Sequence, residues 1–276
     1  MPMKRSVFFL SDRTGITAEA LGHSLLTQFE GIEFDQVTLP FIDSRDKAYQ
    51  AVERINEAAR VDGVKPLLFS TLINSELREL VAENSAGLMF DFFDTFIKPL
   101  EMELRRMSSH AVGRSHGMGT YAQYKARIDA VNFALSNDDG ISTRGFPQAD
   151  IILVGVSRSG KTPTCLYLAL QYGIRAANYP LTEEDLDSHR LPAALHPFRE
   201  HLFGLTIDPV RLQQIRSERR ANSRYSSLQQ CQTEIREVET IYRKEKIPYL
   251  DTSTVSIEEI ATTILLHSGL QRRIPR

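Results

Sequence analysis

The sequence has little cysteine and no long apolar segment. Its 276 residues include only Cys165 and Cys231, and no paired-cysteine spacing of the kind that binds zinc occurs. This argues against a disulfide framework and predicts a reduced setting, so we expect a cytoplasmic protein. The apolar run at residues 7–10 is too short for a signal peptide or a membrane span.

A large excess of charge of either sign is also missing. The formal net charge is −2 and the isoelectric point is near 6.4. This balance gives no electrostatic argument for nucleic acid or an anionic membrane as a partner. The chain shows no internal repeat and no low-complexity tract, and its length favours two globular domains.

One segment carries a strong functional pattern, the phosphate loop G-x-x-x-x-G-K-[ST] at residues 155–162. The apolar run at residues 151–154 before it predicts a buried strand, and the residues after it predict a helix. We therefore predict a nucleotide-phosphate site rather than an ordinary glycine-rich turn. The predicted binding residues are Gly155, Val156, Ser157, Arg158, Ser159, Gly160, Lys161 and Thr162.

The residue types in this loop suit a phosphate ligand. Glycine at positions 155 and 160 tolerates positive φ and close approach, so that successive backbone N–H groups can converge on phosphate oxygens. Lys161 is expected to reach the outer phosphates and Thr162 to hold Mg²⁺ through its hydroxyl. The N-terminus of the following helix adds a favourable potential for an anion.

Predicted strands and helices alternate through the first half of the chain. This alternation predicts an open, mostly parallel sheet covered on both faces. We place an N-terminal α/β domain at residues 1–145, including a Ser/Gly/His-rich connecting segment at 108–119. The expected strands are 6–10, 37–42, 66–72 and 87–93, and the expected helices are 18–29, 45–60, 75–83 and 95–107.

The second predicted domain, residues 146–276, is a phosphate-loop, kinase-like α/β domain. A helix at 210–220 is expected to be capped by Asp208, and a charged helix is expected at 228–244. Ser256 and Glu259 have the spacing of a capping box, which marks the start of the last helix.

Four further constellations have both a structural and a functional interpretation. Asp12 and Gly15 fit a turn with a helix cap, or a second anion or partner site after the first strand. His116 is either an exposed residue of the connecting segment or the proton acceptor from a hydroxyl nucleophile. Asp208 is a helix cap, and it also lies where phosphate-loop enzymes often place a carboxylate that orients Mg²⁺.

The fourth constellation is an arginine-rich stretch. It has the composition of a solvated helix face, but arginines on a segment that breaks the helical pattern can also stabilise charge on a migrating phosphoryl group. We include Arg224 among the catalytic candidates with Lys161, Asp208 and His116. The arginines of the stretch are Arg216, Arg219, Arg220 and Arg224.

The chain resembles the bacterial phosphoenolpyruvate synthase regulatory proteins, relatives of the pyruvate, phosphate dikinase regulatory proteins. The likeness covers essentially the whole chain and is specific as a combination of motifs. The motifs are Gly155–Thr162, Ser11–Glu19, Phe203–Pro209 and Asn222–Tyr225.

The resemblance implies a bifunctional enzyme that acts on phosphoenolpyruvate synthase. One activity is an ADP-dependent kinase of a threonine in that enzyme, and the other removes the phosphoryl group with inorganic phosphate and releases pyrophosphate. By the same resemblance residues 155–162 are the ADP-binding loop. Mg²⁺ is the expected metal, and the sequence leaves open whether the protein is a homodimer.

Two other functions stay open from the residues alone. The strand and helix expected after residue 247 also suit a phosphate-loop kinase of a small metabolite, and a nucleotide sensor without turnover needs the same loop. The motifs of the protein-kinase fold are missing, so any protein kinase activity must use a phosphate-loop architecture.

Overall fold

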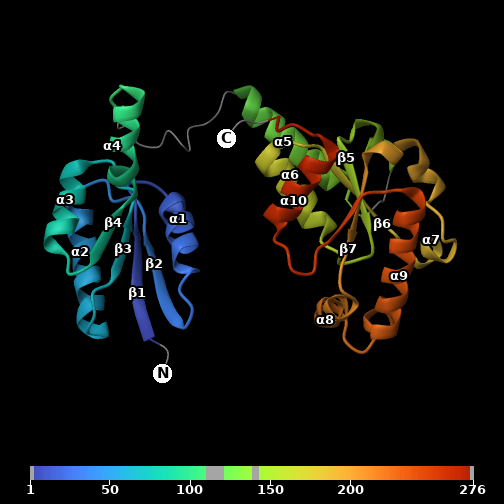
Figure 1. Ribbon diagram of the computed structural model, residues 1–276, viewed down its shortest axis with the longest axis horizontal. Helices are drawn as coiled ribbons and strands as arrows, with labels where there is room; N and C mark the ends of the chain where they lie inside the picture. The colour runs from blue at the N-terminus through green and yellow to red at the C-terminus, as the bar shows by residue number, and fades with distance from the viewer. Residues whose placement is uncertain (1–2, 110–120, 139–142, 274–276) are drawn as a thin grey trace. The chain divides into compact units, whose positions relative to one another are not determined.

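The computed structural model describes residues 3–109, 121–138 and 143–273. The chain forms two compact units, residues 1–117 and 118–276. Each unit has one four-stranded parallel sheet with helices on both faces, as Figure 1 shows. This confirms the predicted α/β fold class. In the described part of the chain, no helix is long and apolar enough to cross a membrane.

The first unit has the strand order β2-β1-β3-β4, all parallel. Its central strand β1 is buried on both faces because the side chains of its apolar run alternate between two cores. Phe8 and Leu10 pack with α2 and α3, whereas Val7 and Phe9 pack with α1 and the start of α4. The elements are β1 (Met3–Leu10), α1 (Ile16–Leu26), β2 (Ile32–Leu39), α2 (Arg45–Asp62), β3 (Leu67–Ser70), α3 (Ser75–Asn84), β4 (Leu88–Asp91) and α4 (Phe92–Leu104).

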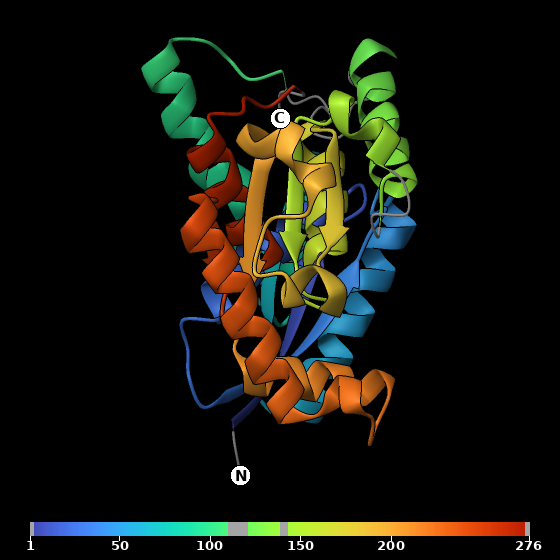
Figure 2. The same cartoon turned by 90° about the vertical axis from the view of Figure 1, so that its right-hand side faces the viewer.

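The second unit repeats this order as β6-β5-β7-β8, again all parallel. Helices α5, α6 and α10 cover one face and α7, α8 and α9 the other. Figure 2 shows α9, in orange, in front of the strands of this sheet. The elements are α5 (Tyr121–Ser136), β5 (Ile151–Gly155), α6 (Lys161–Tyr172), β6 (Ala176–Pro180), α7 (Glu183–Asp187), β7 (Leu202–Thr206), α8 (Pro209–Arg219), α9 (Leu228–Glu245), β8 (Tyr249–Asp251) and α10 (Ile257–Ser268).

The shared strand order creates a switch point in each sheet. In the second unit the chain leaves β5 toward β6 on one side and later returns to β7 on the other. Open α/β sheets bind ligands in the crevice outside the carboxyl ends of two such strands. The predicted phosphate loop follows β5 and therefore lies at this position.

Several predicted boundaries were wrong. The units divide between Gly117 and Met118 rather than at residue 145, because α5 packs on α6 and β6 and belongs to the second unit. β2 starts at Ile32 instead of residue 37, because the polar residues at its start alternate with apolar ones along an exposed sheet edge. It ends at Leu39, before Pro40, because proline has no N–H group to donate to a neighbouring strand. α4 begins at Phe92, where Asp91 caps it, rather than at residue 95.

The loop after β1 is held by its own contacts. Gly15 has a φ of 86°, and a Cβ there would lie 2.6 Å from Thr38 Cγ2. The buried carboxylate of Asp12 accepts a hydrogen bond of 3.2 Å from the Ile73 amide, which ties this loop to the one after β3. These contacts give both residues a structural role without a ligand.

Burial raises the pKa of Asp12, although hydrogen bonds from backbone amides oppose the shift. The carboxyl group therefore stabilises the fold most below its ordinary pKa of 3.8, and this contribution is lost as the pH rises. We expect Asp12→Asn to raise the free energy of unfolding at pH 7, because the amide oxygen still accepts from Ile73 without a buried charge. This gain in unfolding free energy should shrink as the pH falls toward 4, because the Asp12 carboxyl group of the parent then becomes protonated and neutral. Urea unfolding at a series of pH values measures the difference.

Asp43→Asn is the matched control. The hydrogen bond from Lys47 lowers the pKa of Asp43, which is an exposed residue, so its amide variant should gain no stability at pH 7. An Asp12→Asn variant that is less stable than the parent at pH 7, or whose difference does not vary with pH, contradicts this account.

Candidate functional site

The predicted phosphate loop starts at Gly155, the last residue of β5, where the backbone is crowded. A Cβ at Gly155 would lie 2.5 Å from the Leu205 carbonyl oxygen and 2.8 Å from Ser159 Oγ. No residue with a side chain fits there without moving β7 or the loop. Gly155 thus lets the loop fold tightly against the carboxyl end of the neighbouring strand.

The loop ends at Gly160, the residue before α6. Gly160 has a φ of 89° and no side chain caps the helix. An added Cβ at this position would meet no atom within 4 Å, so the space beside it is open. Arg158 also has a positive φ, 74°. Gly160 thus leaves the N-terminus of α6 without a cap from its own side chain, and free N–H groups at a helix N-terminus are the kind of group that binds phosphate oxygens.

Two side chains of the loop fit an anionic ligand. Lys161 is a buried residue, 5 % exposed, and its ammonium group donates a 2.8 Å hydrogen bond to the Val156 carbonyl oxygen across the loop. The hydroxyl of Ser159 is also buried and has no hydrogen-bond partner in the described part of the chain. A buried hydroxyl without a partner is costly, and a phosphate oxygen would satisfy it.

Thr162, in the first turn of α6, points its hydroxyl at a carboxylate. Thr162 Oγ1 donates a 2.8 Å hydrogen bond to Asp138 Oδ1, and the side-chain amide of Asn178 donates to the same oxygen. Among the described residues, no group of three or more His, Cys, Asp or Glu side chains could hold a metal ion. A hydroxyl beside one carboxylate fits Mg²⁺, which keeps several waters and takes further ligands from substrate phosphates.

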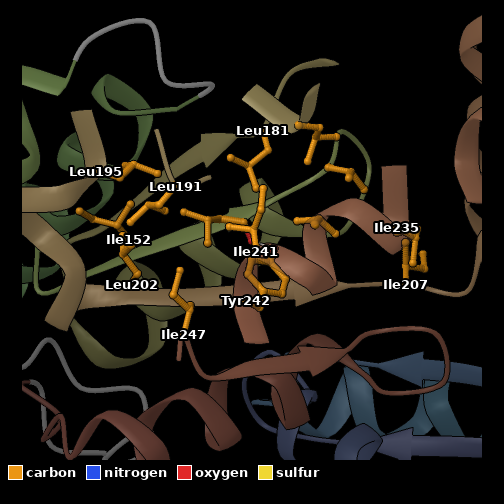
Figure 3. Packing of buried hydrophobic residues seen from close by; sticks show 14 of the residues in the cluster. Ile152, Leu181, Leu191, Leu195, Leu202, Ile207, Ile235, Ile241, Tyr242 and Ile247 are labelled. Carbon is orange, nitrogen blue, oxygen red and sulfur yellow. Dashed lines mark hydrogen bonds between the residues drawn. The ribbon is translucent and has the colours of Figure 1, made fainter. Parts of the chain in front are cut away.

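The strands beneath the loop are joined by a tyrosine from α9. Tyr242 Oη donates to the Val154 carbonyl oxygen at 2.8 Å, and the Leu205 carbonyl oxygen lies at 3.2 Å. Figure 3 shows Tyr242 among the apolar residues of this core, and burial raises its pKa well above the ordinary value. The phenol therefore stays neutral and fixes the spacing of β5 and β7.

Comparison with known proteins places the chain in a family. The profile of the kinase/pyrophosphorylase family matches residues 7–265. The chain belongs to that family. The relatives include proteins of Marinobacter nauticus, Hahella chejuensis and Legionella pneumophila strain Corby, each named "putative phosphoenolpyruvate synthase regulatory protein".

The similarity to these relatives extends over whole chains. The Marinobacter protein is 60 % identical over 270 residues, 98 % of this chain and 99 % of the relative. The Hahella protein is 57 % identical and the Legionella protein 58 % identical, each over 272 residues, 99 % of this chain and 100 % of the relative. The resemblance inferred from the motifs is thereby confirmed at the level of the kinase/pyrophosphorylase family.

Asp208 follows β7 and caps α8. Its Oδ1 accepts from the Val210 and Arg211 amides, each at 2.9 Å, and its own amide donates to Ser253 Oγ at 2.7 Å. The structure therefore shows the capping role that the sequence suggested. A contact of Asp208 with a metal ion stays a prediction, as do all the roles assigned to the loop residues.

The other catalytic candidates have different surroundings. Arg224 lies in a short 3-10 turn, Arg224–Ser226, with 77 % of its side chain exposed, and its guanidinium is 3.4 Å from the Glu183 carboxylate. His116 lies outside the described residues. The catalytic roles of Arg224 and His116 stay predictions.

The arginine that contacts the loop is Arg216, which sequence patterns did not separate from its neighbours. It is 1 % exposed, and its Nη2 donates to the Ser157 carbonyl oxygen at 3.1 Å. Nη1 donates to the Tyr225 carbonyl oxygen at 3.1 Å, and the guanidinium lies over the Tyr225 ring, 4.3 Å from its centre. Ser157 Oγ and Tyr225 Oη are 2.9 Å apart, so a direct hydrogen bond joins these two residues in addition to the bonds that each accepts from Arg216.

Glu234 of α9 neutralises the buried guanidinium. Nη2 of Arg216 lies 2.6 Å from Glu234 Oε2, and Nη1 lies 3.1 Å from Oε1. Burial favours a lower pKa for Arg216, but the hydrogen bonds and charge of Glu234 outweigh it and raise the pKa above the ordinary value. Arg216 is therefore a charged residue that positions the loop and the segment carrying Tyr225.

The two cysteines, Cys165 and Cys231, are buried. Burial raises the pKa of Cys165, with a further increase from the charge of Asp138, and burial likewise raises the pKa of Cys231. Both thiols therefore stay protonated at neutral pH. A thiolate, rather than a thiol, is the reactive form of cysteine.

A cavity of about 720 Å³ lies away from the loop, at the amino-terminal ends of β5 and β7. Its acidic and basic side chains are mixed, and Arg199 is paired with Glu245 and Asp150 with Arg273. These ion pairs engage three of the charged residues that line the cavity, Arg199, Glu245 and Asp150. The phosphate loop remains the better-supported site.

Removing Arg216 should destabilise the second unit. We expect Arg216→Met to cost about 3–5 kcal/mol of unfolding free energy, because Glu234 is left as an unpaired buried charge. The double variant Arg216→Met/Glu234→Leu should recover much of this loss. Urea unfolding followed by circular dichroism measures both values.

Arg219→Met is the matched control, because Arg219 is an exposed residue of the same helix. Its effect should stay within about 0.5 kcal/mol. Equal destabilisation by Arg216→Met and Arg219→Met, or a double variant as unstable as the sum of its single changes, contradicts the buried-pair account.

Proposed function

We propose that the protein is a bifunctional enzyme that regulates phosphoenolpyruvate synthase. In one direction it uses ADP to phosphorylate a threonine of the synthase, and in the other it uses inorganic phosphate to remove that group. The proposal is supported by the family of the chain and by the names of relatives that align with it end to end. The observation that carries it is the predicted phosphate loop, with a buried lysine and a buried Ser159 hydroxyl that has no hydrogen-bond partner among the described residues.

The two reactions balance as phosphoryl transfers. In the kinase direction the threonine oxygen bonds to the β-phosphorus of ADP, the bond to the bridging oxygen breaks, and AMP leaves while the hydroxyl proton passes to a base. In the other direction a phosphate oxygen bonds to phosphorus of the phosphothreonine, the bond to the threonine oxygen breaks, and pyrophosphate leaves. The threonine oxygen regains a proton.

ADP and pyrophosphate both contain a diphosphate group, which explains how one loop would serve both reactions. ADP enters with two linked phosphoryl groups, and pyrophosphate leaves with two. The N–H groups at the start of α6 and the Lys161 ammonium would bind the same P–O–P unit in each case. When bound, Mg²⁺ would neutralise part of the diphosphate charge beside the Thr162 hydroxyl.

Three other residues are proposed for the transfer step. His116 is the candidate base for the threonine proton, and Arg224 is the candidate cation for the migrating phosphoryl group. Asp208 follows β7, the strand next to β5, and is a candidate for orienting the metal or its water.

The direct test uses purified phosphoenolpyruvate synthase and ADP labelled in its β-phosphate. Label should appear on one threonine of the synthase, and inorganic phosphate should then release it as pyrophosphate. Lys161→Ala should lower the transfer rate by about 10²-fold or more, because a cation is lost at the transferred group. Lys244→Ala, an exposed lysine near the end of α9, is the matched control and should keep the parent rate.

The outcomes separate the proposal from its competitors. Synthase that stays unlabelled with ADP contradicts the proposed activity. Turnover of ATP with a small metabolite would identify a metabolite kinase instead. Tight ADP binding without any transfer would identify a nucleotide sensor.

A further inference from the structure

Asp138 reaches the phosphate loop from a distant part of the chain. The turn after α5 is fixed by two backbone bonds: the Asn137 amide donates to Phe133 at 3.1 Å, and the Asn178 amide donates to the Asn137 carbonyl oxygen at 3.1 Å. The second bond attaches the turn to β6, next to the strand that precedes the loop. These bonds place Asp138 beside the first turn of α6.

The hydrogen bonds around Asp138 orient the Thr162 hydroxyl. Because that hydroxyl donates its single proton to Asp138 Oδ1, its lone pairs must face other groups. The Asn178 amide lies 3.3 Å from Thr162 Oγ1 and uses one lone-pair direction. The second lone pair accepts from no other described residue and can bind a cation.

The carboxylate itself keeps free acceptor capacity. The bonds from Thr162 and Asn178 both end on Oδ1. No hydrogen bond from another described residue ends on Oδ2. A carboxylate oxygen, an oriented hydroxyl and an incoming phosphate together form the all-oxygen environment that Mg²⁺ prefers.

We propose that Asp138 is the carboxylate of the metal site, binding Mg²⁺ directly or through one of its waters, together with the hydroxyl of Thr162. This inference rests on the proposed use of the loop for a diphosphate. It assigns the metal carboxylate to Asp138 in the turn after α5, in place of the earlier candidate Asp208 after β7. The hydrogen bonds to the Asp208 carboxylate come from its own helix α8, whereas the Asp138 carboxylate accepts from Thr162 of the predicted loop.

The experiment measures ADP binding by the full chain with calorimetry, once with Mg²⁺ and once with a chelator. The parent should bind ADP more tightly with Mg²⁺. Asp138→Asn should lose about tenfold or more of this enhancement, the range seen when a partner of a metal site is removed. Without metal the same variant should bind ADP as well as the parent or better, because a negative charge near the diphosphate is gone.

Further variants separate a metal role from a structural one. Asn at position 138 keeps an oxygen that accepts from Thr162, so the turn should stay folded. Thr162→Val should also lose the enhancement, and Thr162→Ser, which keeps the hydroxyl, should retain it. Asp187→Asn, an exposed carboxylate of α7, is the control and should behave as the parent. Electron paramagnetic resonance of Mn²⁺ with ADP gives a second readout, because bound Mn²⁺ loses the signal of the free ion.

Three results overturn the inference. The first is full Mg²⁺ enhancement in Asp138→Asn, and the second is equal weakening of ADP binding in that variant with and without metal. The third is loss of the enhancement in Asp208→Asn alone. A parent that binds no ADP under either condition overturns the proposed function as well, and so the two failures are distinguishable.

Discussion

The tight packing of Gly155 between two strands is the constraint on which the site depends. The backbone of the loop can turn there only because no Cβ stands between it and the Leu205 carbonyl oxygen. The Tyr242 hydroxyl is in hydrogen-bond contact with carbonyl oxygens of β5 and β7, and Arg216 donates to the Ser157 carbonyl oxygen within the loop. The loop is thus held at its base and its flank, which fixes the direction of its N–H groups before a ligand arrives. Groups fixed in advance need no reorganisation when charge moves during transfer.

The two units use the same strand order for different purposes. In both, the switch point lies between the first strand and the third. In the first unit the loop at this point is tied to the loop after β3 by the hydrogen bond from the Ile73 amide to Asp12. The buried carboxylate of Asp12 would also repel an anion when it is ionised. In the second unit the same position has a buried lysine and uncapped helix amides. Only the second arrangement suits a phosphate.

The features that depend on local sequence were predictable. The strand and helix on either side of residues 155–160, the alternation of strands and helices, and the capping box at Ser256 follow from patterns within a few residues, and the structure has each of them. Asp138 was not recognised as a site residue, and Arg216 was not separated from the neighbouring arginines, because the roles of both depend on distant contacts. Asp138 stands in a polar turn 24 residues from Thr162, and Arg216 stands in a charged helix whose other arginines are exposed. The position of α5 was missed for the same reason, since its sequence does not show which core it joins.

In the proposed function, one loop binds the diphosphate in both directions of the reaction. The most direct test is a calorimetric titration of the full chain with pyrophosphate, in the absence and in the presence of saturating ADP. The account predicts that ADP abolishes pyrophosphate binding, because both ligands need the N–H groups at the start of α6 and the Lys161 ammonium. Simultaneous binding of the two, with unchanged affinity for pyrophosphate, would contradict it.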